Sequence, residues 1–457
     1  MRFERMMRPC HQFVLRVFCL LLASWSVAGQ EPANAAKIAL RAARMIDGKS
    51  DTPTNKPVIL IDGEKISAVG AGLAIPAGAK VIDLGNVTLL PGLIDVHTHV
   101  LFEIDGTNVS LQDVSMLKVV ATQSTAERAL LGAKLGREDL EAGITTVRDV
   151  GNSGVNGDVA LRDAINNGWL PGPRIVAATR ALAAPGGQFG HLIPEAQKII
   201  EQEYVIVNGP ESARQAVRQA LYDGANCIKV IVNGSPANVT LEEMKAIVDE
   251  AHIAGVKVAA HAIGDKATRI AAEAGVDSIE HAYVITDDTL KMMAQKHIFL
   301  VPTDGTEQEY LNMTFGHRQP TPEERAEQEQ WIKPYVAGNR DRLQRARRFG
   351  VPIAAGSDMY LTMPDEDRGQ ASLDMFDAYS AEGMTPLEII HAATSNGAEL
   401  LGWQGKIGTL EAGKYADIIA VPGDPLQDAT TLKHARFVMK GGVVIKNETG
   451  NETKNKK

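Results

Sequence analysis

The feature that most constrains the fold is the alternation of short apolar runs with amphipathic helical stretches across residues 91–400. The helical stretches repeat apolar residues at i, i+3 and i+4, and each ends near a glycine. Repeated βα units over roughly 300 residues predict an α/β chain built on a (β/α)8 TIM-like barrel. A doubly wound open sheet is the competing fold, although no G-x-G-x-x-G turn follows the first strand. The predicted strands include residues 145–147, 228–232, 256–260, 299–301 and 351–355, and the predicted helices include residues 124–143, 211–223 and 241–254.

The two ends of the chain show a different pattern, in which short apolar runs are separated by glycine and aspartate turns. This pattern is typical of antiparallel strands. We expect residues 30–90 and 401–446 to pair into one small β-sandwich domain, with the barrel of residues 91–400 inserted between them. The polar tail, residues 447–457, is predicted to be disordered. The predicted terminal strands are residues 58–63, 66–70, 81–84, 416–421 and 437–445.

The N-terminus has the pattern of a secretory signal peptide, which we assign to residues 1–29. Four arginines precede the apolar run of residues 17–23, and small residues follow it up to a cleavage site near residues 28–30. The apolar run is short for a bilayer span, so no stable membrane anchor is expected, although a retained anchor is the alternative. The mature protein is therefore predicted to be secreted or periplasmic.

The net charge and the cysteine content of the mature chain limit its binding partners and its disulfide bonds. Removing residues 1–29 takes away four arginines and one glutamate, a net +3, so the formal charge changes from −9 to −12. An acidic chain of this kind is a poor partner for nucleic acid. Only Cys227 remains after the signal peptide is removed, so no internal disulfide is possible.

A pair of histidines, His97 and His99, closes the apolar run of residues 89–96. In a β-strand, residues i and i+2 point to the same face, so both imidazoles would leave the strand together at its C-terminal end. One metal ion at the mouth of a barrel could bind both. Taken alone, such a pair is more often two structural histidines than a metal site.

Four more polar residues occupy matching positions at or near the ends of predicted strands. Lys229 lies inside an apolar strand, where an ordinary ammonium group is costly to bury. A single strand-end histidine is more often a structural hydrogen-bonding residue, but an ordered set from five strands predicts a metal site. The full set is His97, His99, Lys229, His261, His281 and Asp358.

These residues and the segments around them resemble the amidohydrolase superfamily of metal-dependent hydrolases, and more narrowly its imidazolonepropionase-like and Xaa-Pro-dipeptidase-like branch. The resemblance covers the mature chain nearly end to end. The matching segments are residues 91–99 (PGLIDVHTH), 143–149 (GITTVRD), 228–229 (IK), 260–262 (AHA), 279–281 (IEH), 356–358 (GSD) and 410–418 (LEAGKYADI).

The resemblance implies two divalent metal ions, taken as Zn²⁺. His97, His99 and Asp358 would bind the first, and His261 and His281 the second. Lys229 would bridge the two ions as an N6-carboxylated lysine, since burial favours the neutral amine that reacts with CO₂. The implied activity is hydrolysis of a carbon–nitrogen bond by metal-activated hydroxide, with Asp358 as the catalytic base and then acid.

The substrate is predicted to be a small molecule, namely a dipeptide (Xaa-Pro or related) or an N-acyl amino acid. A cyclic amide of the imidazolone type is the alternative, and a catalytically silent binding protein of the same fold is a weaker one. In relatives a histidine directly follows the Gly-Gly of the loop after the third strand, whereas this chain has Gln188 there and His191 three residues later. Either side chain, together with Tyr283, is a candidate substrate contact. Arg148 and Asp149 are predicted to form an interior ion pair, and a homo-oligomer is possible.

Overall fold

The computed structural model describes residues 37–105, 112–189, 191–233 and 237–450. The predicted signal peptide lies outside the described residues, as does most of the predicted disordered tail. The described part of that tail begins in a strand, because β21 (Val443–Asn447) extends to Asn447.

Strands from the two ends of the chain share one six-stranded sheet, in the order β21-β20-β19-β7-β2-β3. A second, four-stranded sheet, β5-β4-β1-β6, comes from the N-terminal strands alone. Residues of both sheets, among them Leu40, Ile59, Ile418 and Phe437, belong to one buried apolar cluster. The bounds are β1 (Ile38–Arg41), β2 (Arg44–Met45), β3 (Thr54–Asn55), β4 (Pro57–Asp62), β5 (Lys65–Ala71), β6 (Lys80–Asp83), β7 (Val87–Pro91), β19 (Ile418–Pro422) and β20 (Phe437–Lys440).

Two details of the terminal strands differ from the prediction. The strands are not all antiparallel, because β1 pairs with β6 and β2 pairs with β7 in parallel. Residues 437–445 are not one strand but the antiparallel pair β20 and β21, which turns at Gly441 and Gly442. Both glycines have positive φ, 54° and 75°, a conformation that glycine adopts without steric cost in a hairpin turn.

The central part of the chain contains parallel strands in two groups, β11-β10-β8 and β13-β12-β14-β15-β16-β17. Backbone hydrogen bonds join these groups at both edges. The N–H of Asn226 donates to the carbonyl oxygen of Ala177 at one edge, and the N–H of Val96 donates to that of Ala355 at the other. The bounds are β8 (Leu93–Thr98), β10 (Ile144–Asp149), β11 (Arg174–Ala177), β12 (Ala181–Ala183), β13 (Tyr204–Ile206), β14 (Cys227–Ile231), β15 (Lys257–Ala262), β16 (Ser278–His281) and β17 (Phe299–Val301).

The last predicted strand, residues 351–355, forms only an isolated parallel bridge between Ile353 and Leu300. Pro352 has no N–H to donate, which limits regular pairing at this point. The segment still connects β17 to β8, because Leu300 donates to the carbonyl oxygen of Pro352 and Val96 donates to that of Ala355. Hydrogen bonds therefore run from β8 through the parallel strands and back to β8.

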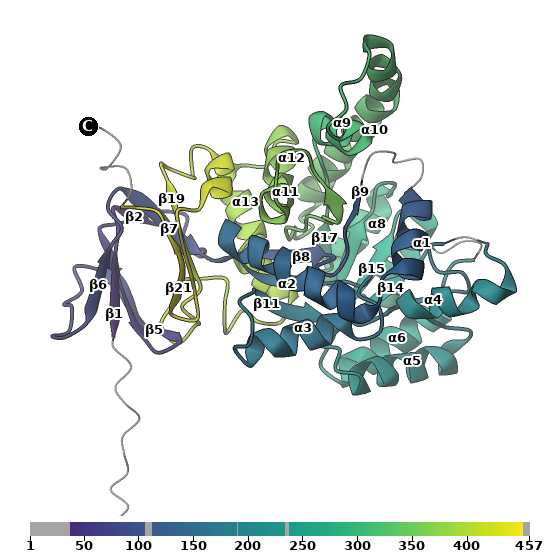
Figure 1. The fold of residues 1–457 in the computed structure, drawn as a ribbon, viewed down its shortest axis with the longest axis horizontal. Helices are drawn as coiled ribbons and strands as arrows, with labels where there is room; N and C mark the ends of the chain where they lie inside the picture. Colours follow the sequence, from purple (N-terminus) through teal and green to yellow (C-terminus); the bar gives the residue numbers. More distant parts are fainter. Residues whose placement is uncertain (1–36, 106–111, 190, 234–236, 451–457) are drawn as a thin grey trace, which may run out of the picture. The chain divides into compact units, whose positions relative to one another are not determined.

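Helices follow most of these strands, and Figure 1 shows α2, α3, α5 and α6 outside the parallel strands. Their buried faces pack with the strands in the largest apolar cluster, which includes Val217, Ile247, Ile228 and Val258. The helices are α1 (Gln112–Thr122), α2 (Thr125–Ala142), α3 (Gly157–Asn166), α4 (Gln197–Glu203), α5 (Pro210–Tyr222), α6 (Leu241–Ile253), α7 (Asp265–Ala274), α8 (Asp287–Lys296), α9 (Glu307–Phe315), α10 (Pro322–Phe349), α11 (Arg368–Leu373), α12 (Met375–Ala381), α13 (Pro386–Ala392) and α14 (Ser395–Leu400).

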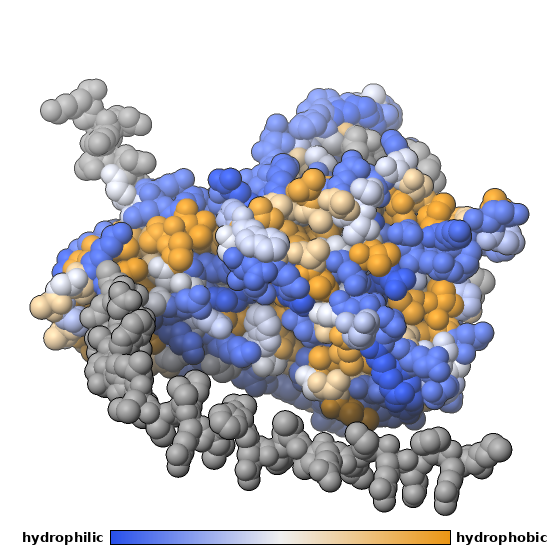
Figure 2. Space-filling view, turned by 60° about the horizontal axis from the view of Figure 1, so that its bottom comes forward, coloured by the Kyte–Doolittle hydropathy of each residue, from blue (hydrophilic) through white to orange (hydrophobic). Residues whose placement is uncertain are grey.

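Two short strands, β9 (Ile104–Asp105) and β18 (Leu361–Thr362), pair in parallel. They pair the segment that follows β8 with the segment that follows Asp358, so these two segments beside the candidate site are held together. None of the described helices is long and apolar enough to cross a bilayer. The face drawn in Figure 2 is a mosaic of hydrophilic and hydrophobic residues.

Candidate metal centre

The six predicted metal ligands line one cavity of about 680 Å³. His97 lies in β8 with His99 just beyond its end, while Lys229 lies in β14 and His261 in β15. His281 is the last residue of β16, and Asp358 follows the bridged segment that contains Ile353. Because the strands are parallel, their carboxyl ends meet at one edge, which explains how residues so far apart in sequence converge.

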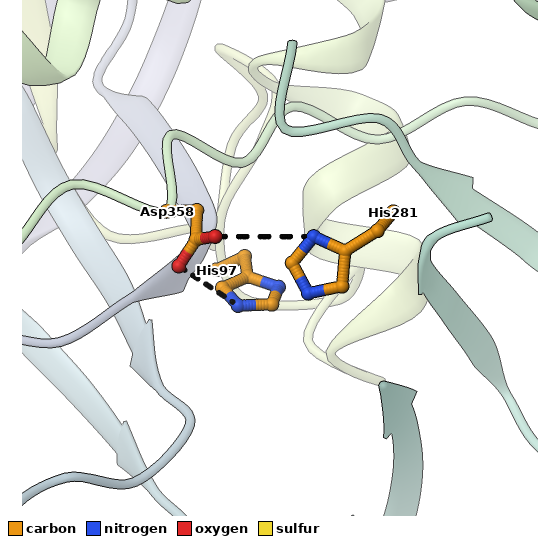
Figure 3. Close-up of side chains that lie close together, drawn as sticks. All are labelled: His97, His281 and Asp358. Carbon is orange, nitrogen blue, oxygen red and sulfur yellow. Dashed lines mark ion pairs between the residues drawn. The ribbon is translucent and has the colours of Figure 1, made fainter. Parts of the chain in front are cut away.

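Asp358 lies among the imidazoles of this cavity. Its Oδ1 is 3.5 Å from Nε2 of His97 and 3.2 Å from Nε2 of His99. Its Oδ2 is 3.8 Å from Nδ1 of His281, and Figure 3 shows the carboxylate pointing toward both His97 and His281. One ligand atom from each of His97, His281 and Asp358 lies within 4.8 Å of the others. These three side chains are therefore close enough to take part in one metal centre.

The histidines are oriented by hydrogen bonds at their other ring nitrogen. Nδ1 of His97 donates to Oε2 of Glu280 at 2.6 Å, and Nδ1 of His99 donates to the carbonyl oxygen of Gly151 at 2.8 Å. Neither acceptor has a proton to give, so Nδ1 of each ring carries a proton, and Nε2 of each ring faces Asp358. A metal-binding histidine is typically held in this way by a carboxylate or a backbone carbonyl.

Thr303 holds His281 in a similar way. Its hydroxyl donates to the carbonyl oxygen of Pro302 at 2.7 Å, which leaves the hydroxyl oxygen free to accept from Nδ1 of His281, also at 2.7 Å.

Asp358, His281 and Thr303 all have positive φ, of 52°, 71° and 56°. Non-glycine residues in this conformation store strain of roughly 1–3 kcal/mol and cluster at functional sites.

A buried ion pair between Arg148 and Glu280 supports His97 from behind. Nη2 of Arg148 donates to Oε1 of Glu280 at 2.9 Å, and neither side chain is exposed. Burial raises the pKa of Glu280, but Arg148 and His97 outweigh that effect and lower it, so the carboxylate stays ionised. Sequence reasoning missed this role of Glu280, although an acidic residue inside a buried strand was a visible signal.

The predicted ion pair between Arg148 and Asp149 is wrong in its partner. Adjacent residues of a strand point to opposite faces, so the two side chains separate. Arg148 pairs with Glu280, whereas Asp149 accepts hydrogen bonds from the backbone N–H groups of Val100 and Gly151.

Burial shapes the charge state of the other candidate ligands. Lys229 is 2% exposed, and burial lowers the pKa of its ammonium group to about 8. Among the described residues it has no hydrogen bond or ion pair. Burial also lowers the pKa of His261 to about 3, and lowers that of His281 well below its ordinary value, so both rings are neutral near pH 7. Neutral imidazoles are the form that binds metal.

Asp358 is held in place and kept ionised by its surroundings. Burial alone would raise its pKa, but His97 and His99 hold that pKa well below the usual range. The N–H of Asp358 donates to the carbonyl oxygen of His97 at 2.7 Å. The preceding Gly356 packs so closely that an added Cβ would lie 2.7 Å from Cβ of His97. The chain here therefore approaches β8 as only glycine permits.

The three predicted substrate contacts are placed differently from one another. Gln188 lines the cavity, and its Oε1 accepts from the hydroxyl of Tyr204 at 3.1 Å. Tyr283 also lines the cavity, with its hydroxyl 3.2 Å from Oγ1 of Thr303. His191 is exposed and is not among the described residues that line the cavity. Of the two loop residues, Gln188 is therefore the one that lines the cavity.

Comparison with known proteins decides the family. The sequence profile described as the Amidohydrolase family matches residues 88–446. The chain belongs to the amidohydrolase family. Proteins of this family generally bind divalent metal ions and act as hydrolases on small-molecule amide bonds.

Individual relatives of this amidohydrolase have modest identity. It is 29% identical to an ochratoxinase of Aspergillus niger over 448 residues, 90% of this chain and 87% of that protein. It is 26% identical to an imidazolonepropionase of Alkaliphilus metalliredigens, covering 79% of this chain and 82% of that protein. A crystal structure of a Xaa-Pro dipeptidase with bound methionine has a TM-score of 0.74 and 32% identity, covering 90% of this chain and 99% of the other.

Proposed function

We propose that this amidohydrolase is a binuclear-metal enzyme that hydrolyses an amide bond of a dipeptide or an N-acyl amino acid. The observation that carries the proposal is the convergence of six side chains with metal-binding chemistry in one cavity. The same cavity contains the ionised carboxylate of Asp358, which has Nε2 of His97 and Nε2 of His99 within 3.5 Å.

The residues present fit two ions, taken as Zn²⁺. Imidazole nitrogen and carboxylate oxygen are ordinary zinc ligands. His97, His99 and Asp358 would hold one ion, and His261 and His281 the other. Buried Lys229 has no hydrogen bond or ion pair among the described residues, and its lowered pKa favours the neutral amine that CO₂ converts to an anionic carbamate. In that form Lys229 would supply an anionic ligand to the metal centre.

Two divalent ions held by these residues would lower the pKa of a water molecule and polarise the substrate carbonyl. Oδ1 or Oδ2 of Asp358 accepts the proton of the attacking water and returns it to the leaving nitrogen, first as general base and then as general acid. The low pKa of Asp358 keeps its side chain in the ionised form, which is the form that can act as a base. Glu280 and the carbonyl oxygen of Gly151 hold His97 and His99 in the tautomer that this arrangement needs.

The names of the relatives support a small amide substrate. A Xaa-Pro dipeptidase at 32% identity and an ochratoxinase at 29% identity each cover 90% of this chain. The similarity to imidazolonepropionase, at 26% identity, favours a cyclic amide as the second candidate. The departure at Gln188, where relatives have a histidine, weighs against a standard dipeptidase.

The remaining parts of the proposal concern architecture and location. The hydrogen bonds that lead from β8 through the parallel strands back to β8 support a (β/α)8 barrel in residues 91–400. The sheet shared by both chain ends supports a composite β-sandwich of residues 30–90 and 401–446. The arginine-rich, apolar start of the chain supports export and cleavage of residues 1–29.

The test is a turnover screen of the zinc-loaded mature protein. The library contains dipeptides, N-acyl amino acids and cyclic amides, and hydrolysis is followed by release of the amine. We expect hydrolysis within the first two classes, loss of activity in a chelator, and recovery on adding Zn²⁺. Activity limited to cyclic amides would select the alternative substrate. Full activity in the chelator-treated, metal-free protein would contradict the proposed chemistry.

A further inference from the structure

The cavity extends beyond the six candidate ligands into a region that the proposed chemistry does not use. Its wall there comes from the α9–α10 helix pair, which projects away from the parallel strands in Figure 1. We define the outer lobe as the four cavity-lining side chains Tyr310 and Met313 of α9 and Trp331 and Tyr335 of α10. None of these residues was singled out by the sequence.

A series of tilted and edge-to-face aromatic contacts connects the metal centre to the outer lobe. The ring centroids of His281 and Tyr283 are 5.5 Å apart, and those of Tyr283 and Tyr335 are 5.2 Å apart. Tyr335 is in turn 5.3 Å from Tyr310, in an edge-to-face arrangement. Edge-to-face contacts at such distances also stabilise an aromatic ligand between the rings.

Trp331 and Tyr335 lie one helical turn apart on α10, on the same face of the helix. Trp331 is 76% exposed, although it lines the cavity. The apolar cluster beneath it, which contains Leu311, Phe315 and Ile332, holds the two helices together without burying the indole. The indole is therefore available to a bound molecule.

Charged groups at the outer lobe are already paired within the protein. Asp304 forms a buried ion pair with Arg342. A carboxylate oxygen of Glu309 accepts the backbone N–H of Thr306 at the start of α9. Among the described lining residues Lys229 is the one lysine or arginine, and the internal segments outside the description, residues 106–111, 190 and 234–236, contain neither.

We propose that the outer lobe binds an uncharged aromatic group of the amide substrate. The proposal rests on the proposed function and names the substrate class of the same site. The aromatic walls offer contact surface to a ring, whereas an anionic group would lose hydration there without gaining a cationic partner. A cavity of about 680 Å³ has room for such a group beside the scissile amide.

The test compares kcat/KM for matched substrates with zinc-loaded enzyme. Acetyl-phenylalanine, acetyl-alanine, acetyl-lysine and acetyl-aspartate vary the leaving side, and benzoyl-alanine places the ring on the acyl side. We expect at least one aromatic substrate to exceed acetyl-alanine by about tenfold or more, and acetyl-aspartate to fall below acetyl-alanine. Equal values across the series, or preference for a charged member, would overturn the proposal.

A variant pair ties the preference to the outer lobe. Trp331→Ala is expected to lower the ratio of aromatic to alanine kcat/KM by about three- to tenfold. Trp169→Ala is the matched control, because Trp169 is also 76% exposed and is not a lining residue. It should leave the ratio unchanged. An unchanged ratio in Trp331→Ala would show that the outer lobe does not select the substrate.

A binding measurement separates this proposal from the proposed function. Asp358→Asn, expected to be inactive, is titrated by calorimetry with acetyl-phenylalanine, benzoyl-alanine and acetyl-alanine. Tighter binding of an aromatic member than of acetyl-alanine would support the outer-lobe proposal, whether or not the wild type hydrolyses these amides. If the wild type hydrolysed none of them, the proposed function alone would be contradicted. Equal affinities for all three compounds would contradict the outer-lobe proposal, whether or not the wild type hydrolyses them.

Discussion

Replacing Asp358 by asparagine is expected to lower kcat by roughly 10³-fold while the protein stays folded. The amide keeps the size and one hydrogen-bonding oxygen of the carboxylate but cannot accept the proton of the attacking water. It also removes the negative charge that lies within 3.5 Å of Nε2 of both His97 and His99. Steady-state kinetics at saturating Zn²⁺, with circular dichroism to check the fold, measures the effect.

Asp365→Asn is the matched control for this substitution. Asp365 is an exposed aspartate that lies beyond β18 and is not a cavity-lining residue. It also has a positive φ, 61°, which asparagine tolerates. We expect it to keep wild-type activity. If Asp358→Asn turned over as fast as Asp365→Asn, the assignment of Asp358 as the catalytic base would be wrong.

The second large effect is expected from Glu280→Gln. The substitution leaves Arg148 charged in a fully buried position, which costs about 3–5 kcal/mol of stability. It also replaces the ionised acceptor of Nδ1 of His97 with a neutral amide, and a lost partner of this kind weakens metal binding by roughly 10- to 100-fold. Urea unfolding of the metal-free protein measures stability, and competition with a chromophoric chelator measures zinc affinity.

A double substitution distinguishes the two roles of Glu280. Adding Arg148→Met removes the unpaired charge, so we expect the double variant to recover much of the lost stability. It should not recover zinc affinity, because His97 still lacks its carboxylate partner. Recovery of both quantities together would mean that Glu280 affects metal binding only through stability. Unchanged zinc affinity in Glu280→Gln would remove it as a positioning residue.

The candidate ligands could be predicted from the sequence because their signal is local. His97 and His99 follow an apolar run at strand spacing, and parallel strands bring their carboxyl ends to a common edge. The convergence of Lys229, His261 and His281 on one cavity follows from that geometry without further information.

What could not be predicted depends on contacts between distant segments. Glu280 alternates with His281 along β16, and only the register between strands shows that it faces His97 and Arg148. The choice between Gln188 and His191 depends on the path of an irregular loop, which has no periodicity to read. Trp331 lies on a helix with charged neighbours, and its place at the cavity depends on how α9 and α10 pack.

The measurement that tests the account most directly is the zinc content of the purified mature protein, combined with anomalous diffraction at the zinc edge. We predict about two ions per chain, one beside His97, His99 and Asp358 and one beside His261 and His281, with extra density on Nζ of Lys229. Fully active protein that binds one ion or none, with an unmodified Lys229, would contradict the two-metal site.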